Sequence, residues 1–164
     1  MVRLHNPGPL IAVKSLMRPI ITFIILFIAV GNSFSQGNKH FNIKKGVAIE
    51  GYDPVSYFDH NPEKGKESIS YSYKDVTYLF TSDANRLKFI DSPDYYIPQY
   101  GGWCAYAIGE NGKKVKIDPE TYKIKDGRLY LFYNFSGYNT LEDWNKNEEP
   151  LLKSADANWK KITQ

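Results

Sequence analysis

The sequence predicts an α+β fold in which two antiparallel β-hairpins form a small sheet, with short helices between and after them. Three observations carry this prediction. Polar and apolar residues alternate in residues 68–73 and again in 76–80, which is typical of half-buried strands. Two further apolar runs flank Asp126-Gly127, a strong signal for a two-residue hairpin turn. Segments with helical spacing of apolar residues separate and follow these hairpins.

The first 35 residues have the features of a secretory signal peptide. Three basic residues precede an almost wholly apolar run at residues 19–31, and small residues follow it. The run is shorter than the roughly 20 residues that a membrane span needs. We therefore expect cleavage before Gln36, no permanent membrane span, and an exported protein that works in the periplasm or outside the cell.

Removal of this segment changes the charge of the chain. The whole sequence has 21 basic and 18 acidic side chains, and Arg3, Lys14 and Arg18 all lie in residues 1–35, which hold no acidic residue. The mature chain would therefore carry 18 of each, since 21 − 3 = 18. A balanced charge gives no basic face of the kind that binds nucleic acid or an anionic membrane.

Residues 36–45 are polar and lack periodicity, so we expect a leader there, followed by a single domain at 46–164. The domain begins with a short extended piece that ends at Tyr52. Asp53 is a good helix N-cap and Pro54 suits the first helical position, which predicts one helical turn over residues 53–58. A polar loop follows this turn.

The first hairpin turns at Lys74-Asp75 and leads into a helix. Ser82 is expected to cap this helix, which reaches about Ile90. Its apolar residues fall at helical spacing: Ala84, Leu87 and Ile90, with Phe89 alongside. Asp94–Ile97 is expected to form one more turn.

The middle of the chain contains PQYGGWCAYA, residues 98–107. Gly101-Gly102 gives the backbone a freedom that other residues lack. Residues 103–108 fit either a short helix or a strand, because periodicity does not decide between them. A turn at Asn111-Gly112 and a short strand at 114–117 are expected to follow.

The C-terminal part is predicted to contain the second hairpin and two helices. Asp118-Pro119-Glu120 forms a turn, and strands at 122–125 and 128–133 come next. Thr140 begins a segment that resembles a capping box, which predicts a short helix to about Lys146. Pro150 is expected to open the last helix, in which apolar residues recur at helical intervals.

Five motifs occur in order along the mature chain: GYDPVSYF, YLFTSDANRLKFIDSPDYY, PQYGGWCAYA, DGRLYLFYN and ADANW. Together they resemble exported proteins of the YHS-domain family. The resemblance covers about residues 46–159, and it implies a YHS-like core with a C-terminal extension. It does not imply a defined activity.

The short metal-binding members of that family carry cysteines at three positions, which correspond to Ser56, Thr81 and Asn85 of this chain. Soft thiolate ligands select copper(I) or zinc. The resemblance therefore implies a transition metal (copper, zinc or iron) as the cofactor, although all three thiols are replaced here.

Cys104 is the only cysteine, so it cannot form a disulfide within the chain. It is a buried structural thiol, a contact to a metal or ligand, or a reactive nucleophile. His60 is the other candidate metal ligand, in a polar loop near the 53–58 turn. If folding joins them, Cys104, His60 and Asp53 would make a metal site or an activated thiol.

All 13 tyrosines lie in the mature part, and their rings either fill a core with polar edges or line a pocket. Asp53 is likewise either a helix cap or a ligand. The candidate ligand-binding residues are Tyr52, Asp53, Tyr57, Tyr100, Cys104 and Tyr106.

These observations favour an exported small binding module over an enzyme. It would bind a metal ion or small ligand and act in metal or redox homeostasis. One alternative is a thiol-dependent enzyme with Cys104 as nucleophile and His60 as base. Another is a structural domain that binds a protein partner through its aromatic surface.

Overall fold

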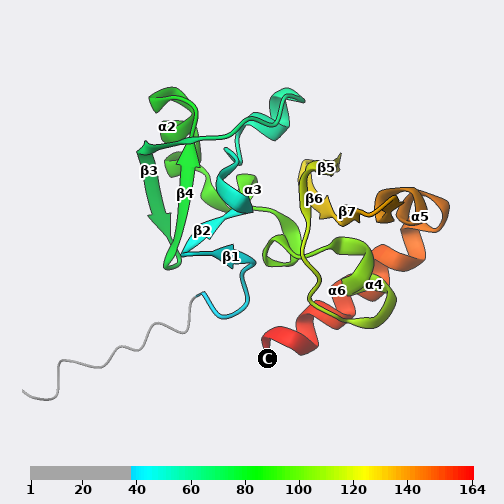
Figure 1. The fold of residues 1–164 in the computed structure, drawn as a ribbon. Helices are drawn as coiled ribbons and strands as arrows, with labels where there is room; N and C mark the ends of the chain where they lie inside the picture. The colour runs from blue at the N-terminus through cyan, green and yellow to red at the C-terminus, as the bar shows by residue number, and fades with distance from the viewer. Residues whose placement is uncertain (1–37) are drawn as a thin grey trace, which may run out of the picture. The chain divides into compact units, whose positions relative to one another are not determined.

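The computed structural model describes residues 38–164, which belong to a compact unit spanning Gln36–Gln164. Helices and small, mainly antiparallel sheets alternate along the chain, so the predicted α+β class is confirmed (Figure 1). The predicted signal peptide lies outside the described residues. Within residues 38–164 no helix has the length and hydropathy to cross a bilayer.

The first predicted hairpin is the largest part of a four-stranded sheet. The strands are β1 (Ile43–Lys44), β2 (Val47–Ala48), β3 (Lys66–Tyr73) and β4 (Val76–Phe80), in the order β1-β2-β4-β3. Strands β3 and β4 pair antiparallel, whereas β2 and β4 pair parallel. Residues 43–45, expected to end a polar leader, are thus the edge strand β1 and its turn.

The alternation of β3 and β4 has the predicted faces. The odd-numbered residues of β3 from Ile69 to Tyr73 are half-buried and the intervening serines are exposed. Val76, Tyr78 and Phe80 of β4 are buried. The apolar face of the hairpin therefore covers one core, as its period of two predicts.

Helix α2 (Asp83–Asp91) begins where predicted, because the Ser82 hydroxyl accepts a hydrogen bond from Asn85 N at 3.2 Å. Its buried face differs from the prediction. Leu87 and Ile90 are 59% and 37% exposed, and Phe89 alone is fully buried, against Tyr78 and Phe80. One aromatic ring thus anchors the helix, and α3 (Pro93–Tyr96) follows it.

The glycine pair lies in the 3-10 segment η3 (Gln99–Gly102), and residues 40–42 pack against it. Gly101 has φ +61°, and a Cβ built there would lie 2.5 Å from the His40 carbonyl oxygen. Asn42 N donates to Gly101 O at 2.8 Å, and Trp103 Nε1 donates to His40 O at 2.8 Å. Residues 40–42 therefore pack on this motif.

Residues 103–108, for which periodicity allowed a helix or a strand, enter helix α4 (Ala105–Asn111). The strand predicted at 114–117 is wrong, because residues 112–117 belong to no helix or strand. This segment instead runs beside the start of α4, where Cys104 N donates to Val115 O at 3.0 Å. Residues 114–117 make this one backbone hydrogen bond to the rest of the described chain, so no ladder forms.

The second predicted hairpin is a sheet of its own, formed by β5 (Asp118–Lys125) and β6 (Arg128–Phe132). Asp126 and Gly127 both have positive φ, as the two-residue turn requires. The two predicted hairpins therefore lie in separate sheets and not in a shared one. A third hairpin, β7 (Asn134–Phe135) with β8 (Tyr138–Asn139), was not predicted.

Two helices close the chain, α5 (Thr140–Lys146) and α6 (Glu148–Thr163). The cap of α5 is Asn139, whose side chain accepts from Leu141 N, and not the predicted Thr140. Helix α6 begins two residues before the predicted Pro150. It crosses α4 closely, since a Cβ at Gly109 would lie 2.7 Å from Leu151 O.

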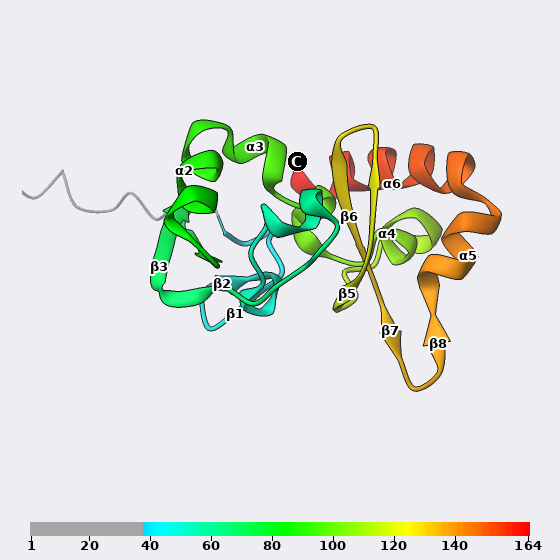
Figure 2. The ribbon, with the colours of Figure 1, turned by 90° about the horizontal axis from the view of Figure 1, so that it is seen from above.

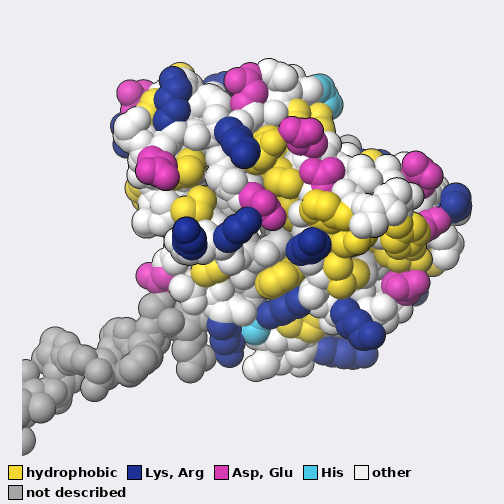
Figure 3. Space-filling view, in the orientation of Figure 1, with side chains coloured by type: hydrophobic (Ala, Val, Ile, Leu, Met, Phe, Trp, Pro, Cys, Tyr) yellow, Lys and Arg dark blue, Asp and Glu magenta, His cyan; other side chains and the backbone are white. Residues whose placement is uncertain are grey.

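Two aromatic-rich cores hold the described residues together. One lies under the four-stranded sheet and includes Tyr57, Tyr78 and Phe89. The other lies among α4, β6, α5 and α6, where Trp144 is fully buried (Figure 2). Since the unit has complete cores of its own, the chain from Gln36 is expected to fold without residues 1–35. Acidic and basic side chains both occur on the face seen in Figure 3.

Candidate functional site

Ser56, Thr81 and Asn85 lie around one buried carboxylate. Asp53 is 0% exposed and precedes the 3-10 turn η2 (Ser56–Asp59). Thr81 follows β4, and Asn85 lies one turn into α2. These segments are 28 and 32 residues away from Asp53 in the chain, so only the fold brings them together.

The Asp53 carboxylate accepts four hydrogen bonds. Oδ1 accepts from Val55 N at 2.8 Å. Oδ2 accepts from Thr81 N and Thr81 Oγ1, both at 2.9 Å, and from Asn85 Nδ2 at 2.7 Å. Ser56 Oγ donates to the Asp53 carbonyl at 2.7 Å and accepts from Glu63 N at 3.0 Å. Donors from three segments thus converge on this one side chain.

A metal ion does not fit these residues. Four hydrogen bonds already point at the carboxylate, and the hydroxyl and amide groups of Ser56, Thr81 and Asn85 are poor ligands for copper(I) or zinc. Among residues 38–164 no group of three or more His, Cys, Asp or Glu side chains could hold a metal ion. The predicted N-cap role of Asp53 is wrong, because the residue that precedes η2 is Val55 and no side chain caps it. The polar network at Asp53 instead holds the turn before η2 against β4 and α2.

Tyr52 and Tyr57 attach the same turn to strand β5. The Tyr52 hydroxyl donates to Glu120 Oε1 at 2.8 Å, a bond that raises the Tyr52 pKa to about 12. Tyr57 is fully buried, donates to Pro119 O at 2.8 Å and meets the Tyr122 ring edge-on. Burial raises its pKa. Both tyrosines therefore use their hydroxyls within the fold.

His60 and Tyr100 lie apart from Cys104. His60 is exposed at the end of η2, with φ 57°. Tyr100 is buried and donates to Asp156 Oδ1 at 2.9 Å, and its pKa is raised by burial and by this bond. It borders a separate cavity of about 350 Å³ beside His40 and Trp159. The predicted grouping of Cys104, His60 and Asp53 does not form.

Cys104 is fully buried at the residue preceding α4. Its Sγ lies 3.4 Å from Thr140 Oγ1, and the Thr140 hydroxyl donates its one proton to Tyr133 O at 3.0 Å. The hydroxyl therefore has only a lone pair left for the sulfur, so the thiol is the donor.

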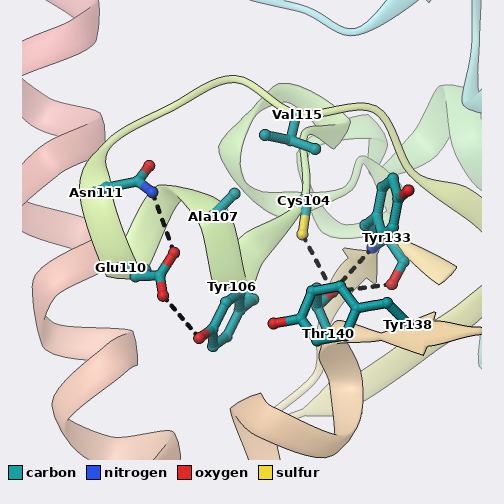
Figure 4. A pocket seen from close by; sticks show the side chains of 9 residues that line it. All are labelled: Cys104, Tyr106, Ala107, Glu110, Asn111, Val115, Tyr133, Tyr138 and Thr140. Atoms are coloured by element: carbon teal, nitrogen blue, oxygen red, sulfur yellow. Dashed lines mark hydrogen bonds between the residues drawn. The ribbon is translucent and has the colours of Figure 1, made fainter. Parts of the chain in front are cut away.

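A pocket of about 240 Å³ opens above this pair, and it is the candidate functional site (Figure 4). Of the residues predicted to bind a ligand, Cys104 and Tyr106 line it. The rest of the lining is Ala107, Glu110, Asn111, Val115, Tyr133, Tyr138 and Thr140. These residues come from α4, the segment after it, and the β7–β8 region, so the pocket joins distant parts of the chain.

Hydrogen bonds fix the polar side of the pocket. Tyr106 donates to Glu110 Oε1 at 2.8 Å, one helical turn along α4, and Asn111 Nδ2 donates to Glu110 Oε2 at 3.1 Å. The bond to Glu110 raises the Tyr106 pKa. A hydrogen bond to Asp143 likewise raises the pKa of Tyr138, which is 51% exposed at the rim. Both phenols therefore stay protonated at neutral pH.

The pocket is suited to binding and poorly suited to thiol chemistry. A nucleophilic cysteine needs a base within hydrogen-bond reach. None of the nine lining residues is a histidine or lysine, and the contact of the thiol is a threonine. Aromatic walls with a few fixed polar groups are typical of small-molecule sites.

Sequence reasoning missed Glu110, Tyr133, Tyr138 and Thr140. Two local signals were present: Tyr106 and Glu110 are spaced i,i+4 on a helix, and Ser136-Gly137 between aromatic residues suits a tight turn. The chain matches no known protein family, and no curated protein or solved structure is significantly similar to it.

Proposed function

We propose that the protein is an exported small-ligand-binding module whose ligand occupies the pocket above Cys104. The observation that carries the proposal is the pocket itself, with aromatic walls and one fixed carboxylate, built from segments that only the fold unites. At about 240 Å³ it is smaller than the roughly 300–1,000 Å³ of sites for drug-sized molecules. Its ligand is accordingly small.

The lining is pre-organised, which lowers the entropy lost on binding. Tyr106 is held by Glu110, and Thr140 is held by both backbone groups of Tyr133. Tyrosine adds a large contact area with only two side-chain torsions to fix. A ligand would therefore meet a surface that is already ordered.

The alternatives have less support. Thiol catalysis lacks a base beside Cys104, as described above. A protein-binding role through an aromatic surface would use the exposed large apolar side chains. The described ones are Leu87 and Ile90 of α2, Tyr95 of α3 and Tyr138 of β8, and the last of these lines the pocket. A metal-based role in homeostasis has no ligand set at Asp53.

The proposal is tested by NMR titration of the chain from Gln36 with two small probes, choline and its neutral isostere 3,3-dimethyl-1-butanol. Saturable shifts of the Ala107, Val115 and Thr140 amides by either probe are the expected result. Val115→Phe, which fills the pocket, should abolish them.

Tyr95→Ala is the matched control for Tyr138→Ala, because both tyrosines are 51% exposed and only Tyr138 lines the pocket. Tyr138→Ala should weaken binding and Tyr95→Ala should not. If neither probe produces saturable shifts, or if Val115→Phe leaves them intact, the proposal is wrong.

A further inference from the structure

The charged side chain in the lining of the pocket above Cys104 is acidic. Among the nine described residues of this lining Glu110 is the one charged side chain, and it is exposed, so it stands at the mouth. Other acidic side chains of the described residues pair with a cation, as Asp143 does with Lys146 at 2.8 Å. Glu110 has no ion-pair partner in the part of the chain that the structure describes. Its charge is therefore available to a ligand.

Three tyrosine rings form the walls near this carboxylate: Tyr106, Tyr133 and Tyr138. The rings of Tyr133 and Tyr138 are 6.4 Å apart and inclined by 52°, so they do not stack on each other. In Figure 4 the Tyr138 hydroxyl points toward Tyr106, and Glu110 lies beside Tyr106. The faces of such rings carry negative potential and attract cations.

The hydroxyl of Tyr106 strengthens this effect. Tyr106 donates its proton to Glu110 Oε1 at 2.8 Å. Donation to a carboxylate shifts electron density into the ring, which raises the attraction for a cation over its face. It also uses the Tyr106 phenol proton, so this hydroxyl is not free to donate to an anion or a sugar.

From this lining we infer that the ligand is a small organic cation of the alkylated ammonium class, its head group among the tyrosine rings and beside Glu110. The inference rests on the proposed function and specifies its ligand. A bare metal ion does not suit the pocket, because hard cations need six or more oxygen ligands and the lining has one carboxylate. An anion would face Glu110 with no compensating charge.

The test compares the two probes in the same NMR titration, because they have the same shape and differ in charge. Choline should bind about tenfold more tightly than 3,3-dimethyl-1-butanol, the preference that a partly desolvated cation–aromatic contact gives. Glu110→Gln keeps an acceptor for Tyr106 but removes the charge. It should weaken choline by about fivefold or more and leave the neutral probe unchanged.

The outcomes separate the two proposals. Equal affinities for the two probes, or no loss of choline affinity in Glu110→Gln, would overturn the cation inference and leave the pocket as a binding site. Failure of both probes to bind would remove the proposed function and this inference with it. Glu110 is exposed, so the variant is expected to fold, and its amide spectrum verifies this.

Discussion

Removal of the buried Asp53 carboxylate tests most directly what holds η2 against β4 and α2. Asp53→Ala takes away an acceptor of four hydrogen bonds. Two come from the backbone N–H groups of Val55 and Thr81, and two from the side chains of Thr81 and Asn85. The side-chain donors can rotate toward other acceptors, whereas the two backbone donors cannot.

The magnitude follows from those two backbone groups. A buried donor left without a partner costs about 1–3 kcal/mol. Two unpaired donors give a loss of about 2–6 kcal/mol. The variant no longer buries a carboxylate charge, which offsets part of this loss. We expect Asp53→Ala to lower the free energy of unfolding by about 4 kcal/mol, a large share of the roughly 5–15 kcal/mol of a typical domain.

Equilibrium urea denaturation, followed by tryptophan fluorescence, measures this loss. Asn85→Ala removes one donor and leaves the other three bonds to Asp53, so about 1–2 kcal/mol is expected. Asp83→Ala is the surface control, since this side chain is 72% exposed and pairs only with Arg86. It should cost under about 0.5 kcal/mol.

The reasoning would be refuted if Asp53→Ala cost no more than the surface control Asp83→Ala at an unchanged denaturant slope. In that case the donors would have found new acceptors, and the carboxylate would not be the group that joins η2 to β4 and α2. A change in the slope would instead indicate an altered unfolded or native state.

Three further outcomes are expected. Gly101→Ala should destabilise the protein by about 2–4 kcal/mol, because φ is positive and the new Cβ collides with the backbone at His40. Gly137→Ala, also at positive φ but with open space around it, should cost about 1 kcal/mol. Equal losses of stability in thermal unfolding would contradict the collision. Burial alone would raise the pKa of Glu148, but hydrogen bonds from Lys123 and Trp144 hold this pKa below 4.5. The stabilisation from these bonds is full above pH 4.5 and is lost as pH falls through the lowered pKa, so Glu148→Gln should lose less stability in acid than the parent protein. Identical pH profiles of stability would argue against the pairing of Glu148 with Lys123. Cys104 is 0% exposed, so a thiol reagent should label native protein at least about a hundredfold more slowly than unfolded protein; rapid labelling would mean that the thiol is accessible.

Local patterns predicted the elements whose signals lie within a few residues. The alternation in β3 and β4, the Asp126-Gly127 turn and the Ser82 cap all appear as expected. The errors arose where packing overrides local preference. Residues 114–117 form no strand: in place of a ladder they make one backbone hydrogen bond, in which Cys104 N donates to Val115 O.

The sequence by itself determined the α+β class, since strand and helix periods are properties of neighbouring residues. It also identified Cys104 and Tyr106 as candidates. Only the tertiary structure decided what surrounds them. Thr140 lies 36 residues from Cys104 and Asn85 lies 32 from Asp53, and no local pattern encodes such contacts. Burial of the two aromatic cores brings these segments together, and the same packing leaves the pocket between them.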